Sequence, residues 1–192
     1  MKSRRETYTE ETIAALLACA RSSFATLGYD AASVETIARQ AQVTTGAIYH
    51  HFSGKKGLFL AVAEQVEAEL LRVAAAVTEP DPWRSLRQAF ALLIDACAAP
   101  DVQRIVFLEA PRVIGAEEWR AIEMKYAFGA MAAVLARLGE TDQLHPHPIE
   151  LSAPVLLAAL AETSRFVAAR PADRVIAIDL MMRVIDSLKR DR

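Results

Sequence analysis

The chain has 192 residues, of which 53% are hydrophobic, with seven glycines, eight prolines and a formal net charge of −2. This composition excludes a disordered or linker-rich protein and leaves enough apolar side chains for a buried core. The overall charge argues against a nucleic-acid binder, but residues 1–60 carry a net charge of +2 and residues 61–192 a net charge of −4, which favours phosphate contact in the first third of the chain.

The sequence gives no sign of secretion or membrane insertion. The basic start at residues 1–5 is not followed by an apolar segment, so we do not expect a signal peptide. The longest apolar run, at residues 151–161, is short and lies between Glu150 and Glu162. We therefore expect a soluble, cytoplasmic protein. Cys19 and Cys97 have no CxxC spacing and are interpreted as buried thiols, with redox sensing as the alternative.

The first predicted element is a long helix. Residues 1–8 are polar and basic and are interpreted as a frayed arm; the alternative is that Arg4 or Arg5 contacts DNA. Apolar residues then repeat at spacings of three and four, which predicts a helix from near Thr9 to Leu27 with Gly28 as the residue that ends it.

Two short helices joined by a tight turn are predicted next. Ser33 is a good N-cap for the first helix and Thr44 for the second, because a hydroxyl can accept from the unpaired N–H groups of a first turn. On the second helix, Ile48 and Phe52 lie four residues apart and would anchor it to the core. Such a pair is a helix-turn-helix, whose second helix can enter a DNA major groove.

The polar and small residues around these anchors predict the DNA contacts. Small side chains at the start of the second helix permit close approach to base edges, and lysines at the start of the next helix can bind phosphate. The predicted base contacts are Thr45, Gly46, Ala47 and Tyr49. The predicted phosphate contacts are Ser33, Thr44, His50, His51, Lys55 and Lys56.

This segment resembles the DNA-binding region of the TetR family of bacterial transcriptional regulators. The matching residues are Ile37, Ala38, Ala41, Val43, the run at 46–52, Lys55, Leu58 and Phe59. Gln42 departs from the usual turn glycine, and Ser53 with Gly54 replaces a more usual proline-containing pair. The resemblance covers the DNA-binding third of the chain. It implies an all-α fold with a three-helix DNA-binding domain, predicted over residues 1–54, and a helical ligand-binding and dimerisation domain over residues 55–192.

Six further helices are predicted, which gives about nine in all. Proline and glycine mark most of their ends, at Pro80, Pro111, Gly115, Gly139 and Pro171. The predicted ranges are 54–77, 82–97, a short helix after 100 that Pro111 and Gly115 break, 116–138, 149–169 and 172–189.

The last two predicted helices are apolar around most of their circumference. A terminal helix cannot bury two faces against one neighbouring layer, which favours a four-helix bundle between two copies of the chain. The alternative is that this surplus belongs to the core of a single chain. The predicted interface residues are Val155, Leu156, Leu160, Ile178, Met181, Met182 and Ile185.

A pocket for a small-molecule effector is predicted among the middle helices. Aromatic stripes at helical spacing are more often core than pocket wall, so these are candidates only. The candidate residues are Trp83, Phe90, Arg104, Phe107, Trp119, Met124, Tyr126 and Phe128. We also expect Arg104, Glu109 and Arg112 to orient a polar group of the ligand.

These features favour a ligand-responsive repressor that binds a near-palindromic operator in double-stranded DNA as a homodimer and is released by a small, largely apolar effector. We do not expect an enzyme, since the chain has no nucleophile elbow, P-loop or HExxH helix. No cofactor and no metal site are expected, because prolines separate His145 from His147 and no cysteine completes a set. The alternative function is an all-helical protein–protein interaction module.

Overall fold

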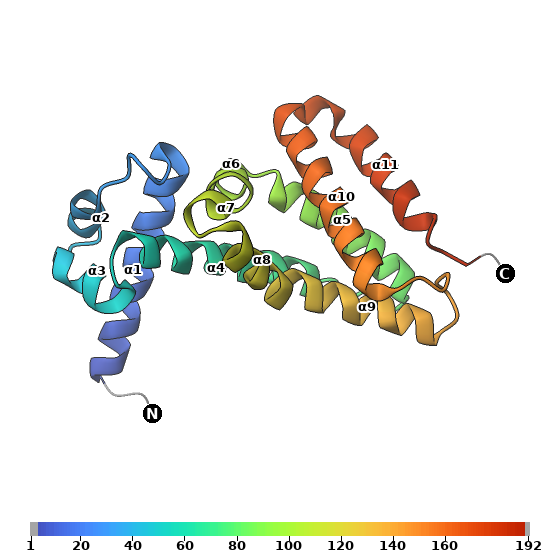
Figure 1. The fold of residues 1–192 in the computed structure, drawn as a ribbon, viewed down its shortest axis with the longest axis horizontal. Coiled ribbons are helices and arrows are strands. Elements are labelled where there is room, and N and C mark those ends of the chain that lie inside the picture. Colours follow the sequence, from blue (N-terminus) through green and yellow to red (C-terminus); the bar gives the residue numbers. More distant parts are fainter. Residues whose placement is uncertain (1–3, 191–192) are drawn as a thin grey trace. The chain divides into compact units, whose positions relative to one another are not determined.

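The computed structural model describes the backbone of residues 4–190 and the side chains of residues 10–190. The fold of this part of the chain consists of helices (Figure 1). The helical residues described form nine continuous segments, and the β-type pairing among them is one isolated bridge between Leu144 and Lys189. The predicted all-α fold of about nine helices is confirmed.

The helices follow one another with short connections. The first four are α1 (Arg4–Leu27), α2 (Val34–Gln40), α3 (Thr45–Phe52) and α4 (Lys55–Ala75). Next come α5 (Pro82–Cys97) and a continuous segment formed by α6 (Pro100–Val102), the π-helical η1 (Gln103–Glu109) and α7 (Ala110–Val113). A second composite segment consists of α8 (Ala116–Glu123), the π-helical η2 (Met124–Phe128) and α9 (Gly129–Glu140). The chain ends with α10 (Ile149–Ala169), η3 (Pro171–Asp173) and α11 (Arg174–Asp186).

Three predicted helix ends were wrong. The first helix begins at Arg4 rather than near Thr9, because each residue added to an existing helix gains a backbone hydrogen bond. Pro111 does not break its helix; it lies in the first turn of α7, directly after the π-helical η1 in the same continuous segment. Gly139 lies inside α9, since one glycine costs about 1 kcal/mol in a helix, and Leu138 beside it is fully buried.

The chain forms two compact units. Unit 1 contains residues 4–66 and 100–119, and unit 2 contains residues 67–99 and 120–190. One boundary therefore cuts α4 between Val66 and Glu67. This division differs from the predicted one at residues 54 and 55, because the first half of α4 and the segment at 100–119 belong with the helix-turn-helix.

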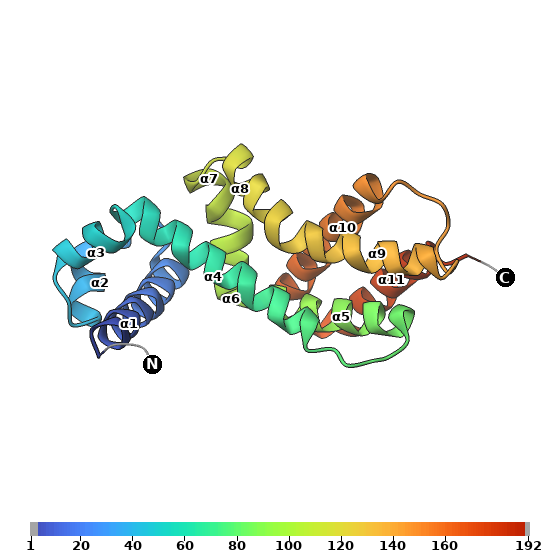
Figure 2. The same ribbon diagram turned by 90° about the horizontal axis from the view of Figure 1, so that it is seen from below.

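Unit 1 is built on α1. Figure 2 shows α2 and α3 side by side next to α1, with the first half of α4 following directly from α3. Three aromatic rings hold the centre: Phe24 lies edge-on to Phe59 at 5.1 Å between centroids, and Tyr29 contacts both rings. Edge-to-face pairs of this kind stabilise a core beyond the area that they bury.

Unit 2 is a helical bundle. α10 packs against α5, α9 and α11, and α5 also contacts α9 and α11 (Figure 1). One face of α5 is turned inward, since Trp83, Leu86, Phe90 and Ile94 are all buried in this core. By length and composition α10 is apolar enough to cross a membrane, but core helices of soluble proteins share this property, and several α10 side chains lie in the core of unit 2.

Candidate nucleic-acid interface

The start of α2 is fixed by Ser33. Its hydroxyl oxygen accepts a hydrogen bond from the Thr36 backbone N–H at 3.2 Å, which confirms the predicted N-cap. The same hydroxyl donates to the Glu35 carboxylate at 2.7 Å, and this bond is the main reason why the pKa of Glu35 lies below its ordinary value. Ser33 therefore holds the helix start in place, and a phosphate contact would have to share its hydroxyl with these two bonds.

The turn between α2 and α3 forms without glycine. Gln42 adopts a left-handed conformation with φ of 58°, the conformation for which glycine is better suited. The Val43 N–H donates to the Ala38 carbonyl at 2.9 Å and closes the turn. The departure from the family pattern at Gln42 therefore changes the side chain and leaves a left-handed turn in place.

Helix α3 turns one face inward and the other to solvent. Ile48 is fully buried and Phe52 half-buried, as the predicted anchors require. Tyr49 is 61% exposed, and Thr45 and His50 are exposed as well. Thr44 occupies the N-cap position, but its side chain makes no capping hydrogen bond, so the predicted role of its hydroxyl was wrong. Gly46 is exposed and Ala47 half-buried, so these two positions at the start of α3 carry no bulky side chain.

The two lysines at the start of α4 contact their own chain. The Lys55 ammonium donates to the Asp30 carbonyl at 3.1 Å and lies 4.7 Å from the centre of the Tyr29 ring. The Lys56 ammonium donates to the Ile114 carbonyl at 3.1 Å and lies 3.8 Å from the Glu118 carboxylate. Both groups would exchange these contacts for a phosphate if they bind DNA as predicted.

Gly57 helps to position α3, and this role was not predicted from the sequence. A Cβ atom at Gly57 would lie 1.7 Å from the carbonyl oxygen of Phe52, the last residue of α3. Only glycine allows α4 to approach the end of α3 this closely, so Gly57 sets the position of the predicted reading helix. The available signal was a single glycine within a helical pattern, which often marks close packing.

The segment at 100–119 is joined to α1 and the following connector by polar contacts. Arg21 pairs with Asp101 at 2.7 Å. The Arg104 guanidinium donates to the Ala25 and Thr26 carbonyls at 3.2 and 2.9 Å, at the C-terminal end of α1, where a positive charge also complements the helix dipole. These partners lie about eighty positions apart along the chain, so no local pattern could have indicated them.

A carboxylate continues this network. Glu109 accepts from the Tyr29 backbone N–H at 3.2 Å and from Arg112 at 2.6 Å, and Arg112 also pairs with Asp30 at 3.0 Å. In unit 1, Arg104, Glu109 and Arg112 thus bind protein groups next to α1. Their predicted role in orienting a ligand finds no support in these contacts.

The predicted pocket residues are divided between the two units. Arg104, Phe107 and Trp119 belong to unit 1, and the other five belong to unit 2. Trp83 and Phe90 lie in the core of unit 2, and the Trp83 indole N–H donates to Asp186 at 3.2 Å. Phe128 packs against the same core, whereas Met124 is exposed and Tyr126 half-buried. The structure therefore brings Trp83, Phe90 and Phe128 into one apolar cluster.

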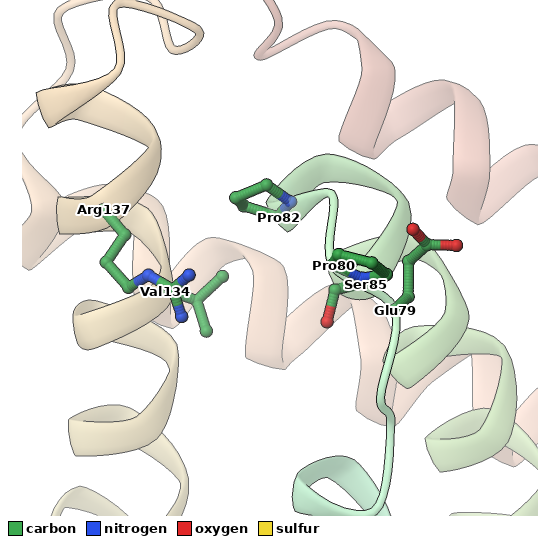
Figure 3. A pocket seen from close by; sticks show the side chains of 6 residues that line it. All are labelled: Glu79, Pro80, Pro82, Ser85, Val134 and Arg137. Atoms are coloured by element: carbon green, nitrogen blue, oxygen red, sulfur yellow. The ribbon is translucent and has the colours of Figure 1, made fainter.

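A small hollow in unit 2 has a different lining. Figure 3 shows it between α9 and the start of α5, with a volume of about 50 Å³ and a wall of Glu79, Pro80, Pro82, Ser85, Val134 and Arg137. A volume of about 10–15 Å³ of this kind is enough for one water molecule, so the hollow is of a size that a few waters can fill. It contains none of the predicted pocket residues and is too small for an organic effector.

The predicted interface residues of α10 and α11 fall into two groups. Leu156, Leu160, Met181 and Ile185 are buried in the core of unit 2, because they face the other helices of the same chain. Ile178 and Met182 are half-buried against this core, and Val155 is exposed. The exposed large apolar side chains on these two helices are Leu151, Val155, Phe166, Val175, Ile176, Leu180 and Val184.

Two family models match the sequence. The one described as "Bacterial regulatory proteins, tetR family" matches residues 16–62, which include α2, α3 and their turn. The one described as "Tetracyclin repressor-like, C-terminal domain" matches residues 83–189, which is more than half of the chain.

Individual relatives agree with these matches. The chain is 30% identical to the Transposon Tn10 TetC protein of Escherichia coli over 147 residues, which cover 74% of this chain and 73% of that protein. It is 31% identical to the HTH-type transcriptional repressor BepR of Brucella suis biovar 1 over 107 residues, 54% of this chain and 51% of BepR. A crystal structure of a TetR-family transcriptional regulator from Pectobacterium atrosepticum superposes with a TM-score of 0.77, 29% identity and 99% coverage of each chain.

Proposed function

Because the chain belongs to the TetR family of bacterial transcriptional regulators, we propose that it is a cytoplasmic repressor that binds its operator as a homodimer. Regulators of this family bind DNA, act as dimers and respond to small-molecule effectors. Related proteins such as BepR are named transcriptional repressors, which supports repression over activation of transcription. A protein–protein interaction module without DNA binding is not favoured.

The observation that carries the proposal is the orientation of α3. Ile48 is fully buried while Tyr49, next to it, is 61% exposed, so the helix is held by one face and presents the other to solvent. We infer that Thr45, Gly46, Ala47 and Tyr49 contact base edges in the major groove. Contacts to phosphates would come from Ser33, Thr44, His50, His51, Lys55 and Lys56. A twofold dimer would place two such helices about 34–36 Å apart, or a multiple of that, on a near-palindromic operator.

The effector response is assigned to unit 2. A small, largely apolar molecule that binds the operator-released state more tightly than the operator-bound state shifts the population toward release. The cluster of Trp83, Phe90 and Phe128 provides apolar surroundings for such a molecule if the bundle opens around it.

A gel mobility-shift experiment with the DNA upstream of the protein's own gene tests DNA binding. We expect a sequence-selective shift that weakens steeply as salt is raised, because phosphate contacts release counterions. Replacing Tyr49 by alanine should weaken binding at least tenfold with the fold retained, because its side chain is mostly exposed. Thr45→Ala should change the base preference, while the matched control Thr78→Ala, exposed in the loop after α4, should change neither. A shift that is unaltered by both Tyr49→Ala and Thr45→Ala would refute the assigned reading surface.

A further inference from the structure

The turn between α3 and α4 consists of Ser53 and Gly54, the pair at which the sequence departs from the family pattern (Figure 2). Both residues have a positive φ, 59° at Ser53 and 104° at Gly54. Serine enters the left-handed region at some cost, whereas a φ near 100° is a conformation that glycine adopts far more readily than residues with a Cβ atom. The backbone of this turn therefore favours glycine at position 54.

The same turn holds Tyr49, the exposed aromatic residue of α3, by its backbone and by its ring. The Ser53 N–H donates to the Tyr49 carbonyl at 3.0 Å. The ring lies so close to Gly54 that a Cβ atom at position 54 would lie 3.3 Å from Cε1 and 3.6 Å from Cδ1 of Tyr49. The shorter distance is tighter than most contacts that Cβ atoms make, so a side chain at position 54 would push the ring aside.

The backbone beneath the Tyr49 ring is fixed to the core of unit 1. The Gly54 carbonyl accepts from the Leu58 N–H at 3.0 Å, and the Leu58 side chain is fully buried. Gly57 brings the first turn of α4 against the carbonyl of Phe52, the last residue of α3. A side chain that rests on an ordered backbone loses less freedom on binding than one that moves freely in water. The turn thus orders Tyr49 before DNA binds.

We propose that Gly54 is a positioning residue for DNA binding, which fixes the direction of the Tyr49 ring by leaving free the space that the ring needs. The inference rests on the proposed function, in which Tyr49 contacts DNA, and it gives a role to a position where the chain departs from its family. Gly54 acts through Tyr49, because it has no side chain with which to contact a base. Ordering one such side chain in advance is worth about two- to tenfold in affinity.

A double-mutant cycle on operator binding tests this role, with fluorescence anisotropy at low salt, where weak complexes are still measurable. Gly54→Ala should weaken binding about two- to tenfold in the wild-type chain, because the added Cβ atom displaces the Tyr49 ring. In the Tyr49→Ala background the same change should alter binding by less than about twofold, since no ring is left to displace. No loss in the wild-type chain, or an equal loss in both backgrounds, would refute the role.

Gly115→Ala is the matched control. Gly115 also belongs to unit 1 and has a similar φ of 112°, but a Cβ atom there would meet no described atom within 4 Å. This substitution imposes the same kind of backbone strain without touching Tyr49, so operator binding should stay within about twofold of wild type. Equal losses from Gly115→Ala and Gly54→Ala would trace the effect to backbone strain and exclude a role for the ring contact.

Fluorine NMR follows the Tyr49 ring directly in the DNA-free chain. With 3-fluorotyrosine at all four tyrosines, the signal that Tyr49→Phe lacks identifies position 49. Gly54→Ala should shift this signal, and Gly115→Ala should leave it in place. Gly54→Asn adds a Cβ atom at the same position with less backbone strain, because asparagine tolerates positive φ, so it should give the shift even if Gly54→Ala fails to fold. A Tyr49 signal that moves in neither variant would show that the ring does not rest on this turn.

The binding data separate this inference from the proposed function. Sequence-selective binding by the wild-type chain without coupling between positions 49 and 54 would remove only the positioning role. A wild-type chain that binds no DNA selectively would overturn the proposed function and, with it, any role of Gly54 in DNA binding.

Discussion

Gly57 lies on α4 where the first turn of that helix meets the end of α3. A Cβ atom there would lie 1.7 Å from the Phe52 carbonyl oxygen and 2.9 Å from its carbonyl carbon, so relief requires movement of the backbone. We predict that Gly57→Ala lowers the free energy of unfolding by several kcal/mol, of the order of other strongly overpacked core sites. Urea unfolding followed by circular dichroism measures this change.

The matched control is another helical glycine. A Cβ atom at Gly139, inside α9, would meet nothing within 4 Å. Gly139→Ala should therefore stabilise the protein by about 0.5–1 kcal/mol, because alanine loses less backbone entropy than glycine in a helix. Equal effects of the two substitutions would contradict the close approach of α4 to the end of α3.

Glu67 makes stability depend on pH. Its pKa is raised from 4.5 to about 7, chiefly by burial and then by the charge of Glu123. Between these two values the folded chain holds a proton that the unfolded chain has released, so its contribution to stability is fully present below about pH 4.5 and is lost as the pH rises through 7.

Glu67→Gln removes this dependence, since the amide stays neutral. The stability of the variant relative to wild type should increase by about 2–4 kcal/mol between pH 4.5 and pH 8, as a shift of this size implies. Urea midpoints of both chains across this range, at one protein concentration, measure the difference. Parallel curves would show that the carboxyl group has an ordinary pKa.

At the scale of elements, Arg104 joins the segment at 100–119 to α1. Its guanidinium donates to two carbonyls that the end of a helix leaves without intrahelical partners. Arg104→Met keeps most of the apolar stem and removes these charge-assisted bonds, so we expect unit 1 to lose about 1–3 kcal/mol of stability. Hydrogen exchange should show faster exchange of amides at the end of α1 and in the connector that follows.

Arg120→Met is the matched control for this change. Arg120 is exposed and belongs to unit 2, so its substitution should leave exchange in unit 1 unaltered. If Arg104→Met and Arg120→Met gave the same exchange pattern, the bonds between Arg104 and α1 would have no measurable effect.

At the scale of the whole molecule, we propose that the exposed apolar side chains of α10 and α11 form the interface of the dimer. Ile176 is 70% exposed and Leu180 is 63% exposed. A charge in the middle of an apolar interface is strongly unfavourable, so Ile176→Asp with Leu180→Asp should convert a dimer to monomers in sedimentation velocity. Operator binding should weaken at least tenfold in the same variant, because two linked reading helices bind far better than one.

The control for the dimer prediction is Leu92→Asp. Leu92 is an exposed leucine on α5, outside the proposed interface, and its change should leave the sedimentation coefficient as in wild type. A wild-type chain that sediments as a monomer at all concentrations would contradict the proposed homodimer.

The sequence predicted the features that depend on neighbouring residues. Helix periodicity, the N-cap at Ser33 and the anchor at Ile48 follow from side chains within one or two turns of each other. The helix-turn-helix and the range of α10 could be predicted for the same reason. The predicted helix start near Thr9 and the predicted stops at Pro111 and Gly139 were wrong, because helix propagation and tertiary packing can outweigh a local signal.

The tertiary structure decided what depends on residues far apart in the chain. Local periodicity indicates that a face of α11 is apolar, but the choice between Met181 as core and Leu180 as surface depends on how α10 and α5 lie beside it. In the same way, Arg104 reaches a helix end about eighty residues away, and Glu67 becomes unusual only because other helices exclude water from it. Burial and pairing depend on which distant residues the fold brings into contact, and the pattern of residues along the sequence does not show which residues those are.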